Sequence, residues 1–488
     1  MILRPSETLT QDQVQSGQRY ILKDSLAGEA MVNLSGGAFI IAMALHLGAS
    51  NFQIGLLASL PILTNIFQLF AMWLVQRYNN RRVVAVAGSF LGRFPMLLAG
   101  FLPFMFSTAV GLKLLLLILF GHYLFGSIAT ASWNAWVKDL IPENRLGSFF
   151  SHRTKLVTIM SAILSLGVSL TIDWVKAHDP AHLTLTYYAI FVTGGIIGLV
   201  GVYWLSRAAE PAPIAVPENV FAQFKKPLKD KNFRNLLKFN AAWTFALNLA
   251  VPFFTVFLMK TIGLPLSNVI GLTILSQISN VLTIKTIGRY TDRYSNKTIV
   301  NICAPIYIAC ILAWPYAAMP ETRFGSLAVL VVISIFSGVA TGGINLALGN
   351  IGMKLAPRRE AMAYMSSLNM VVAFFSATAP IIGGLIADFF ATHQLVSSFQ
   401  WKGAGVSHTF KMIDLHGWGF LFVIGGLMAL SSLRLLDKVK EQGEIQKDKV
   451  MLYMRARLRK RIRSTNIVLR RGLAKPHSLL QREPQKAL

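Results

Sequence analysis

The feature that most constrains this chain is a series of long apolar segments, each about 20 residues or more, separated by short polar connections. A helix of about 20 residues crosses the roughly 30 Å hydrocarbon core of a bilayer, because it rises about 1.5 Å per residue. Hydrophobic residues make up 54% of the 488 residues and charged residues only 14%, which a soluble domain does not match. We therefore predict an all-α integral membrane protein. The continuous runs argue against a transmembrane β-barrel, whose strands alternate over about ten residues.

Twelve transmembrane helices can be placed, in two groups of six. The first group covers residues 25–47, 52–75, 83–106, 110–137, 154–173 and 186–206, and the second covers 238–260, 267–287, 298–319, 326–352, 361–390 and 414–436. Between the groups, residues 207–237 are rich in proline and in basic residues, which is typical of a linker. The predicted organisation is a segment of residues 1–24, bundles over 25–206 and 238–436 on either side of the linker, and a basic tail over 437–488.

The distribution of basic residues predicts the orientation. Loops rich in Lys and Arg stay in the cytoplasm, and placing both termini there puts most of the 47 basic residues on that side. The same rule accounts for much of the net charge of +26, so no nucleic-acid partner is needed. No cleavable secretory signal precedes the first apolar run. We expect a multi-pass protein, and the bacterial cytoplasmic (inner) membrane is the expected location.

The tail contains the run Arg455, Arg457, Arg459, Lys460, Arg461 and Arg463. Such a run can bind anionic lipid headgroups, at about 1 kcal/mol per basic residue near the surface, or it can simply be solvated. We keep both interpretations, and expect the chain to be a monomer.

An internal repeat relates the two groups. The segment from Leu140 to Gly147 after the fourth span matches Leu355 to Met362 after the tenth, and the same sequence offset connects Asp173 to Asp388. We call this spacing of 215 residues the repeat offset. Both aspartates lie at the predicted outer end of the following helix. The pattern favours parallel duplication of a six-helix unit.

The loop after the eighth span carries a recognisable motif. It contains Gly288, Arg289, Asp292, Arg293 and Lys297. This resembles the Gly-x-x-x-Asp-Arg/Lys-x-Gly-x-Lys/Arg loop of the major facilitator superfamily (MFS), with Ser295 in place of the second glycine. The loop after the second span departs further from the pattern: Arg77 and Arg81 remain, but Met72 and Gln76 stand at the glycine and acidic positions.

The resemblance implies two six-helix bundles that rock about a central cavity, with these loops as gates. Asp292 with Arg289 or Arg293 is the candidate gate pair, and a simple topology signal is the alternative. The family's fold places the first, fourth, seventh and tenth helices around the cavity, with the eighth beside it. Candidate cavity residues on these helices are Asn33, His122, Trp133, Asn134, Asn240, Trp243, Thr244, Asn248, Gln277, Asn280, Thr341 and Asn345. Such polar stripes can also join membrane helices by hydrogen bonds.

Glu29, Arg93 and His122 are ionisable side chains inside predicted spans, where each charge costs at least about 2.5 kcal/mol. Glu29 and His122 are the candidates for proton coupling, and each can instead serve packing or pairing. For Arg93 we favour a structural tie over substrate binding. Cys303 and Cys310 share one span, and their spacing predicts neither a disulfide framework nor a zinc site.

The sequence contains no nucleotide-binding loop, zinc triad or hydrolase motif, so we expect no enzyme activity, no cofactor and no metal site. The predicted function is secondary active or facilitative transport of a small polar or amphipathic organic solute by alternating access, with uptake preferred. Proton symport and facilitated diffusion both stay open. The alternatives are a non-transporting scaffold or sensor acting through its basic tail, and an efflux or copper transporter. The outer loop 391–413 is long enough to cover an outer vestibule.

Overall fold

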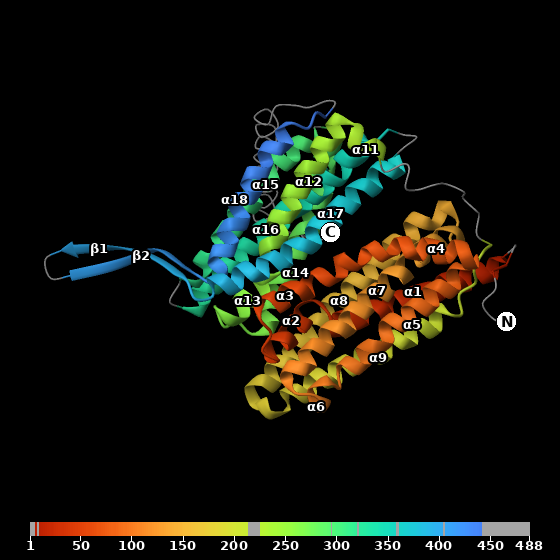
Figure 1. The fold of residues 1–488 in the computed structure, drawn as a ribbon, viewed down its shortest axis with the longest axis horizontal. Coiled ribbons are helices and arrows are strands. Elements are labelled where there is room, and N and C mark those ends of the chain that lie inside the picture. The colour runs from red at the N-terminus through yellow and green to blue at the C-terminus, as the bar shows by residue number, and fades with distance from the viewer. Residues whose placement is uncertain are drawn as a thin grey trace, which may run out of the picture.

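The computed structural model describes residues 5–6, 9–212, 225–293, 295–319, 322–357, 361–403 and 406–441. The described chain forms two helical bundles and one β-hairpin (Figure 1). Part of the predicted linker, residues 213–224, and the tail from residue 442 lie outside the described residues. The predicted lipid-binding run of arginines and lysines therefore stays a prediction.

The N-terminal bundle comprises residues up to the linker. Its elements are α1 (Gln11–Ser35), α2 (Gly37–His46), α3 (Asn51–Leu63), the 3-10 helix η1 (Thr64–Phe67), α4 (Gln68–Tyr78), α5 (Arg81–Ala99), α6 (Leu102–Met105), α7 (Thr108–Leu140), α8 (Glu143–His178), the 3-10 helix η2 (Pro180–His182) and α9 (Leu183–Leu205).

The C-terminal bundle follows the linker. Its elements are α11 (Lys225–Lys229), α12 (Lys231–Ala250), α13 (Phe253–Lys260), α14 (Leu266–Arg293), α15 (Asn296–Ala313), the 3-10 helix η3 (Pro315–Ala318), α16 (Arg323–Leu355), α17 (Ala361–Phe390), β1 (Gln394–Gly403), β2 (Val406–His416) and α18 (Trp418–Asp437).

Within the described residues, eleven helices are long and apolar enough to cross a membrane. The predicted second span is the exception. It is divided into α3, η1 and α4, and its longest apolar helical stretch, Asn51–Phe67, is shorter than the others. Pro61 lies inside α3 and removes a backbone donor, which explains why regular helix gives way to a 3-10 turn there. By length and composition alone, the described residues therefore supply eleven of the twelve predicted spans.

The first helix begins well before the predicted residue 25. Thr10 accepts a hydrogen bond from the N–H of Gln13, whose side chain in turn accepts from the N–H of Thr10. This capping box starts α1 at Gln11, so the helix carries an extra polar stretch ahead of its apolar part. One consequence is that Asp24 lies inside the first helix rather than before it.

The repeat offset found in the sequence recurs in the helix boundaries. It relates the start of α3 at Asn51 to that of α14 at Leu266, and the start of α5 at Arg81 to that of α15 at Asn296. It also relates α7 to α16, which are both 33 residues long. The two bundles thus repeat one arrangement, as parallel duplication predicts.

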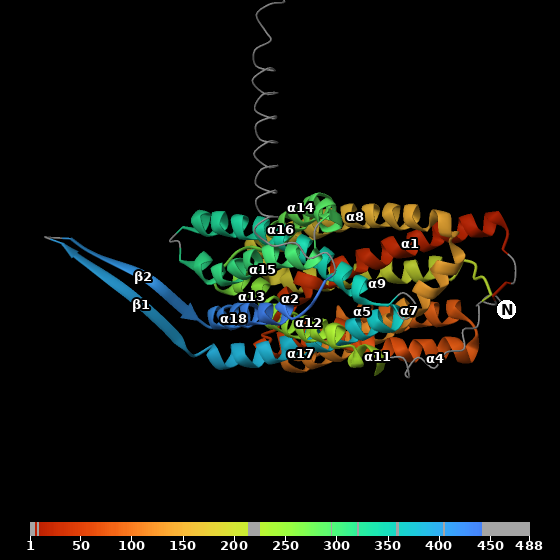
Figure 2. The same ribbon diagram turned by 90° about the horizontal axis from the view of Figure 1, so that it is seen from above.

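The predicted outer loop 391–413 is not a loop. Strands β1 and β2 pair antiparallel from Gln394 opposite His416 to Gly403 opposite Val406, with an irregularity after Ser397. The β-forming residues Val396, Phe399 and Trp401 explain why this segment forms strands in an otherwise helical chain. The hairpin extends away from both bundles (Figures 1 and 2), so it does not lie over the space between them.

We call the end of the bundles that carries the hairpin the hairpin end, and the opposite end, where the linker joins them, the linker end. The bundles meet toward the hairpin end, where α3 packs along α17 and α8 packs against α14, and they diverge toward the linker end (Figure 1). Helices α2 and α13 add a smaller contact. The arrangement is that of two bodies joined at one end.

Candidate functional site

A cavity of about 500 Å³ lies within the N-terminal bundle. Its walls come from α1, the α3–η1 segment, α5, α7 and the first half of α8. Pro61 and His122 line it near the middle of the bundle, whereas Phe150 and Arg153 line it nearer the linker end. The volume suits a small organic molecule.

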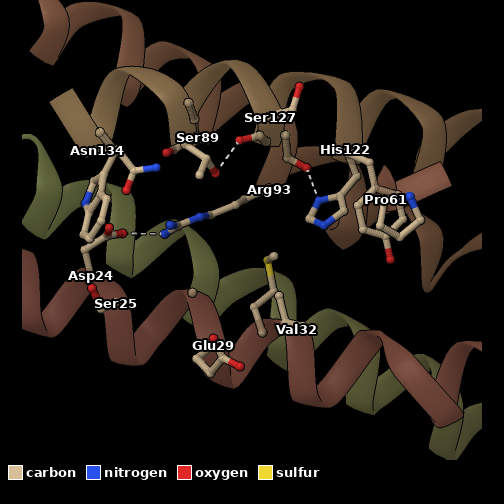
Figure 3. A pocket seen from close by; sticks show the side chains of 18 of the residues that line it. Asp24, Ser25, Glu29, Val32, Pro61, Ser89, Arg93, His122, Ser127 and Asn134 are labelled. Atoms are coloured by element: carbon tan, nitrogen blue, oxygen red, sulfur yellow. Dashed lines mark hydrogen bonds and ion pairs between the residues drawn. The ribbon is translucent and has the colours of Figure 1, made fainter. Parts of the chain in front are cut away.

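An ion pair builds one wall of this cavity. Asp24 of α1 accepts a hydrogen bond from the Arg93 guanidinium of α5 at 2.6 Å, and Arg93 also donates to the carbonyl of Gly198 in α9 at 2.9 Å. Figure 3 shows Arg93 reaching across to Asp24. A methyl group added at Gly201 would lie 2.6 Å from the guanidinium, so glycine is needed for this approach. The pair ties three helices together, which is the structural role favoured for Arg93.

His122 of α7 has one fixed ring nitrogen. Its Nδ1 lies 2.7 Å from the carbonyl oxygen of Gly92 in α5. A carbonyl only accepts, so Nδ1 carries the hydrogen and Nε2 is left for another partner. In Figure 3 the ring lies beside Pro61. A neutral His122 can therefore accept a proton or a hydrogen bond at Nε2.

Arg153 and Trp133 form a second wall. The guanidinium carbon of Arg153 lies 5.3 Å from the centre of the Trp133 ring, a cation–π contact that holds the side chain in place. Among the described residues, the buried Nε atom of Arg153 and the buried hydroxyl oxygen of Ser25 have no hydrogen-bond partner. Both residues line the cavity, so each has a polar atom at this site that the described chain does not satisfy.

Glu29 is the second carboxylate in the cavity wall. Its side chain is partly buried, and within the described residues no hydrogen bond or ion pair to its carboxylate is found. Its backbone carbonyl accepts from the side chain of Asn33. Glu29 therefore contributes a charge that the protein leaves unpaired.

Of the candidate cavity residues in the N-terminal bundle, the structure brings His122, Trp133 and Asn134 together in this cavity. Asn33 does not line it. Its amide donates to Ser161 and accepts from Ser165, so it joins α1 to α8. This is the helix-tying alternative considered for such residues.

The candidates in the C-terminal bundle lie elsewhere. Asn240 is buried and donates to the carbonyl of Leu236, and Trp243 is buried against Phe239. The others are placed as follows: Asn248 bonds to the carbonyl of Thr244 and to Ser376, Asn280 donates to Thr341, and Gln277 and Asn345 are exposed. Their role in a substrate path stays a prediction.

The gating-loop residues are described in part. Arg81 is buried, donates to Asp139 of α7 and forms an ion pair with Glu210 at 3.4 Å, while Arg77 is exposed. The backbone is described at Gln76, Gly288, Arg289, Asp292 and Arg293, but no side-chain contact or exposure is described at these positions. The Asp292 gate pair therefore stays a prediction.

Two glutamates cap helices at the linker end. Glu210 accepts from the backbone N–H groups of Arg81 and Arg82 at the start of α5, and Glu441 accepts from those of Asn296 and Lys297 at the start of α15. Arg81 and Asn296 are related by the repeat offset, as are the helices they begin. Each glutamate closes its own bundle rather than joining the two.

The pKa of Glu441 reflects this cap. Burial alone would raise the pKa, but hydrogen bonds from Ser295, the Lys297 N–H, Asn296 and Lys354 lower it to about 2. The Lys354 ammonium lies 3.0 Å from the carboxylate. The group is therefore charged at any ordinary pH.

Two aspartates join the bundles at the hairpin end. Asp173, near the end of α8, accepts from the N–H groups of Leu266 at 2.8 Å and Ser267 at 2.6 Å, the first residues of α14. Asp388, near the end of α17, accepts from the N–H groups of Asn51 at 3.1 Å and Phe52 at 2.9 Å, the first residues of α3. Each carboxylate caps a helix of the opposite bundle.

The backbones also approach closely at this end. A side chain added at Gly55 of α3 would collide with the carbonyl of Pro380 in α17, and one at Gly384 would collide with the carbonyl of Asn51. Trp418, at the start of α18, donates to the Asn51 side chain at 3.0 Å. We call the two aspartate caps and the two glycine contacts the hairpin-end clamp.

Three functional features do not follow from the sequence patterns used above. Asp24 precedes the predicted first span, although the Thr10–Gln13 capping box signals an earlier helix start. Arg153 immediately precedes the predicted fifth span, and its place in the cavity depends on the extension of α8 beyond that span. The repeat relates Asp173 to Asp388, but it does not show that each contacts the other bundle.

The donors of the cavity do not suggest a metal. Within the described residues, no group of three His, Cys, Asp or Glu side chains is placed to bind a metal ion. The charged groups present are two carboxylates and two guanidinium groups, which suit an organic solute better than a cation.

Comparison with known proteins identifies the family. The sequence profile of the Major Facilitator Superfamily matches residues 27–380, and a comparison with curated protein sequences finds no match. Among solved structures, the nucleoside transporter NupG aligns with a TM-score of 0.62 at 17% identity, covering 89% of this chain and 100% of that chain.

Two further solved structures share the fold. The bacterial homologue of the iron transporter ferroportin, in its inward-facing state, aligns with a TM-score of 0.62 at 13% identity over 88% of this chain and 99% of that chain. The xylose transporter XylE from E. coli, in an inward open conformation, aligns with a TM-score of 0.57 at 13% identity, covering 90% of this chain and 98% of that chain. These likenesses concern the fold, and the profile match covers well over half of the sequence. The chain is a multi-pass integral membrane protein with a transporter fold, and it belongs to the Major Facilitator Superfamily.

Proposed function

We propose that the protein is a secondary transporter of a small polar or amphipathic organic solute, working by alternating access, with uptake as the direction. The observation that carries this proposal is the combination of a charged cavity at mid-bundle with a clamp that joins the bundles at one end. A solute cavity in bundles that are joined at one end by reversible hydrogen bonds is what alternating access needs.

The proposed orientation follows from the basic residues. The linker end carries Arg81, Arg82 and Lys297 together with the basic linker, so the positive-inside rule places it in the cytoplasm. The hairpin end then faces out. Together, α3, η1 and α4 form the second span in chain order, which brings the number of spans to twelve. In this orientation the structure is an inward-facing state. XylE and the ferroportin homologue, both solved in inward-facing or inward-open conformations, support that assignment through their shared fold.

The transport cycle proposed here opens the hairpin-end clamp. In the outward-facing state, Asp173 and Asp388 lose their helix caps and are solvated by water, while the linker ends of the bundles approach each other. The cost of losing these charge-assisted bonds is offset by hydration of the carboxylates, so the two states can lie within a few kcal/mol of each other. Glu29 or the Nε2 atom of His122 can bind the proton if transport is proton-coupled.

The experiment is solute uptake into proteoliposomes that contain the purified protein. Candidate solutes are first screened by the rise in melting temperature that a ligand of the folded state produces. A solute that raises the melting temperature and accumulates inside protein-containing vesicles, but not empty ones, supports the proposal. A well-folded protein that binds members of no solute class and moves none of them contradicts it.

A tail deletion separates transport from the scaffold alternative. Residues 442–488 carry the basic run, and a transporter keeps its flux without them, whereas a scaffold that acts through its tail loses its role. The matched control is the full-length protein in vesicles with and without anionic lipid. Flux that vanishes on deletion, with the bundles still folded, favours the scaffold.

A further inference from the structure

We infer that the solute is a zwitterion, with an acidic group bound at Arg153, an ammonium group bound at Glu29 and an apolar or aromatic body between them. This rests on the proposed transport function and names the substrate class of the same cavity.

The described cavity wall holds two acidic side chains, Asp24 and Glu29, and two arginines, Arg93 and Arg153. Asp24 and Arg93 neutralise each other at 2.6 Å, and Arg93 is further bonded to a backbone carbonyl. The four charges therefore sum to zero. Glu29 and Arg153 each lack an ion-pair partner among the described residues, although Arg153 also acts on Asp24 from a greater distance.

The Arg153 guanidinium is held over Trp133, and its Nε is buried with no hydrogen-bond partner among the described residues. A guanidinium offers two parallel N–H donors, which match the two oxygens of a carboxylate or the oxygens of a phosphate. Because Trp133 fixes the plane of the group, little conformational entropy is lost when an acidic group binds. The missing partner at Arg153 is an acid.

Glu29 and Ser25 lie four residues apart on α1, so they share one face of the helix, and both line the cavity. The Ser25 hydroxyl is buried without a partner, and the Glu29 carboxylate is unpaired in the described chain. An ammonium group has three donors and would satisfy both oxygens. The missing partner on this wall is a cation that donates hydrogen bonds.

Three aromatic side chains also line the cavity. Tyr123, Trp133 and Phe150 line it, and Phe150 meets Trp133 edge to face with ring centres 6.4 Å apart. Such a wall favours an apolar or planar body.

Other solute classes leave charges unsatisfied. A simple anion leaves Glu29 unpaired, a simple cation leaves Arg153 unpaired, and a sugar or nucleoside leaves both. An unpaired charge away from bulk water is costly, so each of these classes binds less well than a zwitterion of the same body.

The test uses one aromatic body with three charge patterns, and an uncharged nucleoside for comparison. Binding to the purified full-length protein is measured by thermal shift and calorimetry at pH 7. The zwitterions are L-phenylalanine and the longer glycyl-phenylalanine, N-acetyl-phenylalanine supplies the anion alone, phenylalaninamide supplies the cation alone, and uridine is uncharged. At least one zwitterion is expected to bind about 10-fold or more tightly than the three other compounds.

Two variants are expected to remove the protein's preference for the zwitterion over a singly charged compound. Glu29→Gln should make N-acetyl-phenylalanine bind at least as well as the zwitterion, and Arg153→Gln should do the same for phenylalaninamide. Lys155→Gln, an exposed cation on the same helix, is the matched control and should change nothing. The melting temperature of each ligand-free variant shows whether it is folded.

Several results overturn the inference. They are failure of both zwitterions to bind, equal binding of a singly charged compound by the unaltered protein, and zwitterion binding that survives Arg153→Gln. If uridine binds and is taken up by vesicles, the zwitterion inference fails while the proposed transport function stands. If no solute of any class binds or moves, the transport proposal itself fails.

Discussion

Asp173 and Asp388, which are related by the repeat offset, make the same contact in opposite directions across the two bundles. Asp173 caps the first two N–H groups of α14, and Asp388 caps those of α3, whose start is related to that of α14 by the same offset. The two contacts are therefore related as by a pseudo-two-fold axis that exchanges the bundles. A duplicated unit thus supplies one carboxylate and one helix start to each half of the clamp, so both sides open or close together.

The close contact at Gly55 predicts that a larger side chain will force the hairpin end open. In Gly55→Val the added carbons meet the Pro380 carbonyl, which belongs to the backbone of α17 and cannot turn aside. The readout is labelling of Ser267→Cys by a membrane-impermeant maleimide, because Ser267 lies against Asp173 in the clamp. We expect labelling to become several-fold faster.

The control for this experiment is Gly167→Val in α8, where an added side chain meets nothing within 4 Å. The native Cys303 and Cys310 are buried and contribute little background. Labelling that is equally fast in both valine variants, or unchanged by Gly55→Val, contradicts the clamp.

The ion pair between Asp24 and Arg93 predicts a strong coupling between the two residues. Arg93→Met leaves Asp24 charged and buried, and loss of one partner of a buried pair costs about 3–5 kcal/mol. We expect a large fall in melting temperature in detergent. Asp24→Asn combined with Arg93→Met should recover much of that loss, since no buried charge remains.

Arg19→Met, an exposed residue of the same helix α1, is the control and should leave the melting temperature unchanged. Additive effects of Asp24→Asn and Arg93→Met would mean that the two side chains do not interact.

Glu441 predicts how the stability of the C-terminal bundle depends on pH. Its pKa is lowered from 4.5 to about 2 in the folded protein, so the cap stabilises fully above about pH 4.5 and its contribution is lost as the pH falls from there toward 2. A shift of this size corresponds to at most about 3 kcal/mol, which screening by solvent reduces. Glu441→Gln should lower the melting temperature at pH 7 and flatten its decline below pH 4.5.

Asp437→Asn tests the specificity of that effect, because Asp437 is exposed and four residues away. An unaltered acid response in Glu441→Gln, or an equal change in Asp437→Asn, would show that the cap is not the titrating group.

The sequence predicted the parts of the fold that depend on one helix at a time. Apolar length placed eleven of the spans, and the repeat around Asp173 and Asp388 anticipated the relation between the bundles. The start of α1 was set by a capping box rather than by hydropathy, so Asp24 was missed. The hairpin was missed because the long segment between the last two spans was interpreted as a loop, although it contains the β-forming residues Val396, Phe399 and Trp401.

The candidate site was predicted less well, for a physical reason. A polar stripe shows which face of a helix is polar, but not whether a neighbouring helix or a solute covers it. Asn33 and Asn248 bond to neighbouring helices, whereas His122 and Trp133 line the cavity, and nothing in their spacing separates the two cases. Arg93 finds its partner on a helix whose proximity is a property of the fold alone.

The most direct test of alternating access measures distances at both ends of the bundles by double electron–electron resonance. Spin labels at the exposed positions Lys176 and Arg323 report on the hairpin end, and labels at Arg77 and Met353 report on the linker end. In Asp173→Asn combined with Asp388→Asn, we predict a longer distance at the hairpin end and a shorter one at the linker end, in the same fraction of molecules. Distances that stay unchanged at both ends, or that lengthen at the hairpin end alone, would contradict two bundles rocking about a central site.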